Sequence, residues 1–110
     1  FIQLTGNDDN ALEFNKRGGV GSISVTANIA AKYCSDFQNA CLSNINKAIE
    51  LDKILQPIHN AMFIESNPSP VKYAASLLGL CNPKVRLPLV EVTDETKSKI
   101  TNALKVAKLL

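Results

Sequence analysis

The sequence has no tryptophan, one methionine, one histidine and three cysteines, and its net charge is small. No run of apolar residues approaches the ~20 needed to cross a bilayer, so the sequence predicts no transmembrane helix. The formal charge of +2 is too small to indicate nucleic acid or an anionic membrane as a partner. What remains is ordinary globular composition, because 45% of the residues are hydrophobic and 20% are charged.

The scarcity of cysteine limits the redox chemistry of the chain. Cys34 and Cys41 are predicted to lie on one helix, where seven residues separate them by about 10.5 Å along the axis. That spacing exceeds the roughly 7 Å that a disulfide tolerates between Cα atoms. With Cys81 as the third, we interpret all of them as reduced, mostly buried thiols of a cytoplasmic protein.

The most informative stretch is the glycine-rich run at residues 18–28, which leads into a short β-branched strand predicted over residues 20–26. A first strand is predicted over residues 1–5 and a helix over residues 11–17. Strand, helix and strand within so few residues indicate a βαβ unit with parallel strands. The glycines precede their strand, whereas a dinucleotide-binding loop follows one, so a nucleotide site is not predicted.

Beyond residue 28 the pattern is helical. Helices are predicted over residues 29–42 and 45–64, with a kink at Pro57, which lacks the N–H of a regular helical residue. A third runs from Ser69, as its N-terminal cap, to Gly79. Residues 82–92 are predicted to be an extended linker.

A final helix is predicted from Thr93 to the C-terminal region, with Thr93 as its cap. Lysines near its end suit the negative end of the helix dipole. The apolar stripe predicted to be buried is Ile100, Ala103, Leu104 and Ala107.

Two strands followed by four helices would not form a self-sufficient domain, because a two-stranded parallel sheet has two open edges and is marginal in water. We therefore expect the chain to begin within a larger α/β fold. The last two βα units of a barrel, followed by a helical extension, explain this order of elements best.

Several motifs, in this order and spacing, resemble the C-terminal part of the dihydrodipicolinate synthase family. They are Phe-Ile-Gln-Leu-Thr-Gly-Asn-Asp at 1–8, Gly-Gly-Val-Gly-Ser-Ile-Ser-Val-Thr-Ala-Asn at 18–28, His-Asn at 59–60, Asn-Pro-Ser-Pro-Val-Lys at 67–72, Leu-Gly-Leu at 78–80 and Arg-Leu-Pro-Leu at 86–89. The wider family is the Schiff-base-forming class I pyruvate aldolases, which includes N-acetylneuraminate lyase. The motifs at 23–28 and 67–72 favour the synthase branch.

The resemblance implies a fold and a division of the chain. Residues 1–42 would be the end of a TIM (β/α)8 barrel, with strands seven and eight and their helices, and residues 43–110 a C-terminal helical domain. The fragment itself would be mostly α. The active site of such a barrel lies at the C-terminal ends of its strands.

The resemblance also implies a function. The parent enzyme would be a cytoplasmic lyase that condenses pyruvate with aspartate semialdehyde through a lysine Schiff base, in lysine and diaminopimelate biosynthesis. It would be a homotetramer and would need no cofactor, because the imine uses the protein's own amine. The Schiff-base lysine and the proton-relay tyrosine would precede residue 1. The isolated chain is therefore expected to be inactive.

The substrate-binding residues that the resemblance implies are Ile23, Gly6, Asn7 and Asp8. The main-chain carbonyl of Ile23 would line the pyruvate pocket, and Gly6 would let substrate approach the backbone. Asn7, where family members often have Asp, and Asp8 would contact the second substrate. On the residues alone, Gly6 is equally well a turn glycine, and Asp8 and Asp9 are helix caps. No metal site is predicted, and His59 is interpreted as structural.

Two other functions stay open at this level. One is a non-catalytic helical module that acts only in interaction or assembly. The other is a related aldolase, such as N-acetylneuraminate lyase, acting on sialic acid or a sugar acid.

Overall fold

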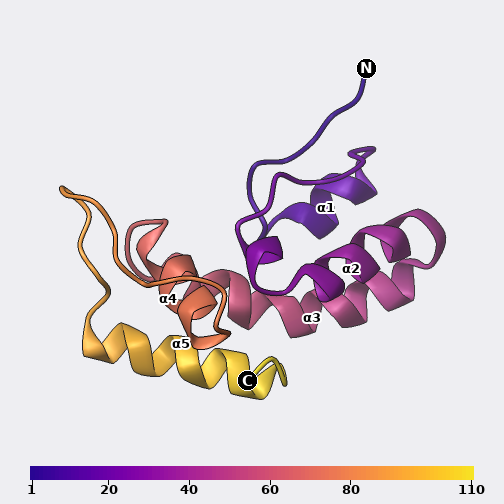
Figure 1. Cartoon of the computed structure of the whole chain (residues 1–110). Helices are drawn as coiled ribbons and strands as arrows, with labels where there is room; N and C mark the ends of the chain where they lie inside the picture. The colour runs from indigo at the N-terminus through magenta and orange to yellow at the C-terminus, as the bar shows by residue number, and fades with distance from the viewer. The chain divides into compact units, whose positions relative to one another are not determined.

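The computed structural model describes all of residues 1–110 and is mostly helical (Figure 1). In chain order its elements are α1 (Ala11–Lys16), the 3-10 helix η1 (Thr26–Asn28), α2 (Ala31–Ser43), α3 (Ile45–Ala61), α4 (Ser69–Leu77) and α5 (Asp94–Val106). The prediction of a largely helical chain, with four helices after residue 28, is confirmed.

The two predicted strands are much shorter than the sequence suggested. The segments pair in parallel, as predicted, but the pairing is a single bridge between Thr5 and Ser22. Thr26, predicted to end the second strand, instead begins η1. Each segment has only one neighbour, and a strand without partners on both edges is marginal. The side chain of Ile2 is accordingly 80% exposed.

Helix α1 forms where the sequence predicted it, although it ends at Lys16, and Gly18 adopts a φ of +104° just beyond. The prediction that Asp8 or Asp9 caps this helix is wrong. The N-cap position is Asn10, and no side chain caps the helix there. The carboxylate of Asp8 instead accepts hydrogen bonds from the backbone N–H groups of Val25 and Thr26, at the start of η1.

Asn44 is the only residue between α2 and α3. It is the C-cap of α2, and its side-chain Oδ1 accepts a hydrogen bond of 3.2 Å from the N–H of Lys47 in α3. The break predicted at residues 43–44 is confirmed. Helix α3 ends at Ala61, three residues before the predicted end, and contains Pro57. The kink at Pro57 stays a prediction.

The chain divides into two compact units, Phe1–Gln56 and Pro57–Leu110. In unit 1 the buried apolar side chains are Ala11, Ile29, Ala30, Phe37, Ala40, Ala48, Leu51 and Leu55. In unit 2 they are Ile58, Ala61, Met62, Val71, Ala74, Val92, Ile100, Leu104 and Ala107. The predicted boundary between barrel and helical domain, at residues 42–43, lies within unit 1, and its assignment stays a prediction.

In unit 2, α4 packs against α5. The prediction that Ser69 caps α4 is wrong, because the N-cap position is Pro68 and Ser69 is the first helical residue. The Ser69 hydroxyl instead donates a 2.7 Å hydrogen bond to the carbonyl of Val90, which ties the helix to the linker. Gly79 follows α4 with a φ of +74°, the left-handed conformation expected after a helix.

Helix α5 matches its prediction closely. The Thr93 hydroxyl accepts a hydrogen bond from the N–H of Thr96 and caps the helix. Of the predicted stripe, Ile100, Leu104 and Ala107 are buried and Ala103 is half-buried. Residues 82–92 contain no helix or strand, as predicted.

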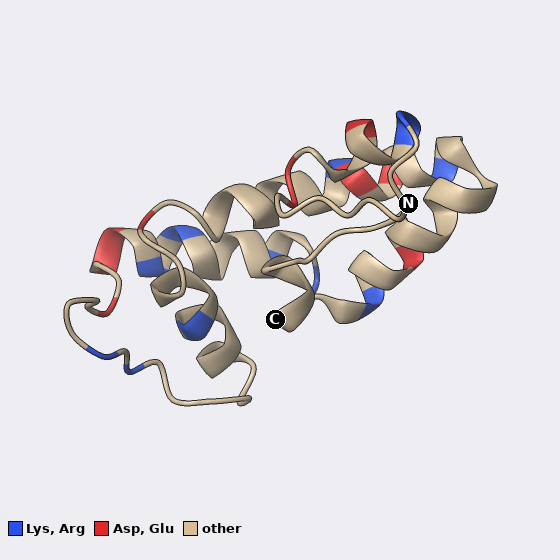
Figure 2. Cartoon of the chain, turned by 90° about the horizontal axis from the view of Figure 1, so that it is seen from above, with Lys and Arg blue, Asp and Glu red and all other residues tan.

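Charged residues of both signs are interspersed along the chain (Figure 2). All ion pairs of the structure join residues three or four apart on one helix or at its end, such as Lys32 with Asp36 at 3.0 Å. Such exposed pairs contribute little to stability. None of the helices combines the length and apolar character that a membrane span requires.

Candidate functional site

The paired segments of unit 1 bring three of the predicted site residues to one edge. Val20 donates to the carbonyl of Gln3 at 3.1 Å, and Thr5 donates to the carbonyl of Gly21 at 3.0 Å. Ile23 then donates to the carbonyl of Thr5 at 2.8 Å. Because the segments are parallel, the residues that follow each bridge partner emerge together. Gly6, Asn7 and Ile23 therefore lie at the carboxyl-terminal end of this pair.

Gly6 differs from the other glycines of the chain. A Cβ atom at Gly19 would collide with the ring of Phe14, and one at Gly21 would lie 3.1 Å from the side chain of Leu4. Gly18 and Gly79 have positive φ. Gly6 has neither feature, since a Cβ built there meets nothing within 4 Å. Nothing within this chain requires glycine at position 6.

Asn7 and Ile23 are both exposed at this edge. The backbone N–H of Asn7 donates to the Thr5 hydroxyl at 3.2 Å, so Thr5 fixes the turn while the Asn7 side chain stays exposed. The side chain of Ile23 is 73% exposed, which is unusual for isoleucine in a folded domain. These positions are accessible to a ligand or to another part of a larger fold.

Asp8 behaves differently from its neighbours. Its residue is only 5% exposed, and its Oδ2 accepts hydrogen bonds from the N–H of Val25 at 2.9 Å and of Thr26 at 3.1 Å. The sequence marked Asp8 as a candidate contact for substrate but gave no sign of this long-range bond. Thr5, which also organises the turn, was missed, although a threonine at a predicted strand end is a signal to consider.

Unit 1 offers no reactive nucleophile near this edge. Burial raises the pKa of the Cys34 thiol to about 11, and the charge of Asp8 adds to that rise. A hydrogen bond involving Ser24 opposes it. A thiol with so high a pKa is protonated at neutral pH and reacts slowly. All three cysteines are free, as expected for reduced thiols, but the prediction that they are mostly buried is wrong, because Cys34 and Cys41 are half-buried and Cys81 is exposed.

The other chemically versatile side chains lie elsewhere. Tyr33 is in α2 and Tyr73 is in α4, as predicted. No lysine belongs to the paired segments, and His59 is buried in α3. No group of histidine, cysteine, aspartate and glutamate is arranged to hold a metal ion.

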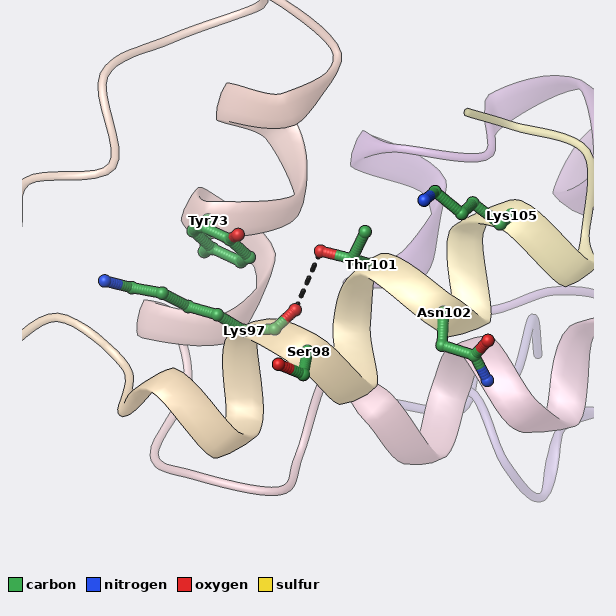
Figure 3. A pocket seen from close by; sticks show the side chains of 6 residues that line it. All are labelled: Tyr73, Lys97, Ser98, Thr101, Asn102 and Lys105. Atoms are coloured by element: carbon green, nitrogen blue, oxygen red, sulfur yellow. Dashed lines mark hydrogen bonds between the residues drawn. The ribbon is translucent and has the colours of Figure 1, made fainter.

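Unit 2 contains an open polar hollow of about 310 Å³ between α4 and α5 (Figure 3). Its lining is Tyr73, Lys97, Ser98, Thr101, Asn102 and Lys105. The Lys97 amine lies 5.9 Å from the centre of the Tyr73 ring and 3.4 Å from Asp94. The Thr101 hydroxyl donates to the carbonyl of Lys97 at 2.8 Å. The hollow contains none of the predicted site residues, and the side chains of Lys97 and Ser98 bond to Asp94 at its margin.

Comparison with known proteins bears on the edge in unit 1. The family model for the dihydrodipicolinate synthetase family matches residues 1–107, nearly the whole chain, including Gly6 and Ile23. The chain belongs to this family.

Relatives within the dihydrodipicolinate synthetase family agree with the match. The chain is 72% identical to the 4-hydroxy-tetrahydrodipicolinate synthase of Pelagibacter ubique and 52% identical to that of Parvibaculum lavamentivorans. Each alignment covers all of this chain but only 39% and 38% of the respective relative. The chain thus spans well under half the length of the relatives it matches.

Solved structures agree with the fold. The dihydrodipicolinate synthase of Thermotoga maritima matches with a TM-score of 0.98 at 37% identity, over 100% of this chain and 38% of that one. The structures of the family that the chain matches are TIM-barrel enzymes. The few paired residues of unit 1 therefore correspond to part of a barrel, although here they form only one bridge.

Proposed function

We propose that this chain is the segment of a 4-hydroxy-tetrahydrodipicolinate synthase that contains barrel strands seven and eight and the C-terminal helical domain. The enzyme would condense pyruvate with aspartate semialdehyde through a lysine Schiff base. The observation that carries the proposal is the parallel pairing of the two segments, which places Gly6, Asn7 and Ile23 at one edge. That edge is where a TIM barrel has its active site.

The proposed roles follow from the chemistry of each position. The main-chain carbonyl of Ile23 would accept a hydrogen bond in the pyruvate pocket, while the Ile23 side chain would pack against parts of the barrel outside this chain. Gly6 would let substrate approach the backbone, which is consistent with a glycine that nothing in this chain requires. The exposed amide of Asn7 would contact the aldehyde substrate.

The reaction needs groups that this chain does not supply at the site. The paired segments contain no lysine, and both tyrosines lie on helices. We propose that the Schiff-base lysine and the proton-relay tyrosine belong to other strands of the barrel. This chain would shape the pocket. The amine of the Schiff-base lysine would form the imine with pyruvate, so the reaction would need no cofactor.

The proposal extends to assembly, location and domain boundaries. Residues 1–42 would complete the barrel and residues 43–110 would form the helical domain of a cytoplasmic homotetramer. The free cysteines suit a reducing compartment. Exposed apolar side chains on the paired segments, such as Ile2 and Leu4, suit burial by neighbouring strands of the barrel.

A segment exchange tests the proposal. This chain would replace the matching 39% of the Pelagibacter ubique synthase, to which it is 72% identical. The chimera would be incubated with pyruvate, reduced with borohydride and analysed by intact mass and peptide mapping. We expect a pyruvate adduct on a lysine outside this chain, together with condensation activity. The unaltered synthase is the control.

The outcomes separate the alternatives. A folded chimera that neither traps pyruvate nor condenses it would contradict the proposal and favour a non-catalytic helical module. An adduct on this chain would contradict the division of roles. A chimera that traps pyruvate but cleaves N-acetylneuraminate, and does not accept aspartate semialdehyde, would favour the lyase branch.

A further inference from the structure

The carboxylate of Asp8 joins the two segments that form the edge in unit 1. It lies two residues after Gly6, and its Oδ2 accepts hydrogen bonds from Val25 at 2.9 Å and Thr26 at 3.1 Å. Val25 is itself two residues after Ile23. The same oxygen therefore fixes the turn after the first segment to the backbone that follows the second.

The two turns that Asp8 connects are each held by their own hydrogen bonds. The Thr5 hydroxyl donates to Asn10 at 2.9 Å and accepts from the N–H of Asn7 at 3.2 Å. On the other segment, Ser24 accepts a hydrogen bond of 2.9 Å from the N–H of Ala27. Both turns are thus fixed internally, and Asp8 is the side chain that connects one to the other.

Burial distinguishes Asp8 from a residue that meets substrate. The residue is 5% exposed, whereas Asn7 and Asp9 beside it are exposed. Hydrogen bonds from two N–H groups to a buried carboxylate are charge-assisted, which makes them stronger than bonds between neutral groups. Such a contact holds backbone in place and has little freedom to turn toward a ligand.

We propose that Asp8 is a positioning residue that sets where the Ile23 carbonyl lies relative to the turn at Gly6 and Asn7. This inference rests on the proposed function, in which that carbonyl and that turn face the two substrates. Asp8 acts through the backbone of residues 23–26 and touches neither substrate. Because a misplacement of about 1 Å can lower a rate by about a hundredfold, the connection matters to catalysis beyond its effect on stability.

The test uses the same chimera with substitutions at residue 8. Asp8→Ala removes the acceptor, and we expect the KM for pyruvate to rise about tenfold and kcat to fall at a temperature where the chimera stays folded. Asp8→Asn keeps an oxygen that can accept both bonds, and it should restore most of the activity.

Asp9→Ala is the matched control. Asp9 is the exposed neighbour of Asp8. Its backbone carbonyl accepts a 2.9 Å hydrogen bond from the side chain of Gln56, and Asp9→Ala leaves that carbonyl in place. We expect the KM for pyruvate of this variant to stay within about twofold of the parent chimera. Circular dichroism and melting temperatures are measured for every variant.

Each outcome decides something different. A chimera without substitutions that is inactive overturns the proposed function and this inference with it. An active chimera in which Asp8→Ala lowers only the melting temperature, with an unchanged KM for pyruvate, overturns this inference alone. If the Asp8→Ala variant does not fold, the Asp8→Glu variant tests the inference instead. Its longer side chain keeps a carboxylate but shifts its hydrogen bonds to the N–H groups of Val25 and Thr26. A folded Asp8→Glu variant with an unchanged KM overturns the inference, and a raised KM supports it.

Discussion

The two compact units hold their parts together in different ways. In unit 1, the paired segments rely on backbone hydrogen bonds and on the buried carboxylate of Asp8, while Ile2 and Ile23 leave apolar surface exposed. In unit 2, α4 and α5 pack together, and Ile100 and Leu104 are fully buried. The paired segments are thus joined by polar contacts, whereas α4 and α5 are joined by packing that includes fully buried apolar side chains.

The largest effect should come from unit 2. Leu104→Ala removes a fully buried side chain and should lower the free energy of unfolding by about 2–5 kcal/mol, because a cavity remains where the leucine was. Urea denaturation of the chain, followed by circular dichroism, measures it. Val106→Ala on the exposed face of α5 is the control and should change the value by less than about 0.5 kcal/mol. Equal effects would contradict the view that the buried face of α5 stabilises unit 2 more than its exposed face does.

A pair of glycine substitutions sharpens the comparison within unit 1. Gly19→Ala places a Cβ against the ring of Phe14 and 3.0 Å from the Phe14 carbonyl, so it should destabilise the chain by about 1–3 kcal/mol. Gly6→Ala meets no atom within 4 Å and should leave stability almost unchanged. In the chimera, however, Gly6→Ala should weaken pyruvate condensation. Loss of stability in Gly6→Ala would mean that the turn itself requires glycine.

A smaller effect is expected at the start of α5. Thr93→Ala removes the hydroxyl that accepts from the N–H of Thr96, and it should cost about 1 kcal/mol of stability. Ser98→Ala, an exposed position on the same helix, is the control. The measurement is again urea denaturation, and an effect no larger than that of the control would show that the cap contributes nothing.

The smallest effect concerns pH. Hydrogen bonds from Thr96 and Thr93 hold the pKa of the Glu65 carboxyl below its ordinary value. The folded chain therefore favours the carboxylate, so its contribution is present above the ordinary pKa and disappears as the pH falls through the lowered one. Melting temperatures between pH 6 and pH 3 should show a shallower acid slope in Glu65→Gln than in the unsubstituted chain. An identical slope would exclude a role for Glu65.

How well the sequence predicted each feature depended on how local its cause is. Helices α2 to α5 and the Thr93 cap arise from neighbours within a few residues, so periodicity and capping residues indicated them. Asp8 and Ser69 were assigned to caps because they have capping side chains and precede or begin helices. In the structure their partners are Val25, Thr26 and the carbonyl of Val90, many residues away. Residue type alone could not choose between a local and a distant partner.

The two strands were also predicted only in part from the sequence. The β-branched residues at 20–26 predicted a strand, and the parallel pairing that was expected of it is present. Within this chain the pairing is limited to one bridge, as an isolated pair of strands is at best marginally stable. Of the site, the resemblance supplied Gly6, Asn7, Asp8 and Ile23; the structure places Gly6, Asn7 and Ile23 at one edge and buries Asp8 behind it. The role that we infer for Asp8 required the structure.

The single residue between α2 and α3 restricts how this protein can change in length. Asn44 closes one helix and opens the next, so the junction has no spare residue to absorb an insertion or a deletion. One additional helical residue would turn everything that follows by about 100° and advance it by about 1.5 Å. Natural variants of this sequence should therefore gain or lose residues in the irregular stretch at 82–92, and the junction at Asn44 should keep a constant length.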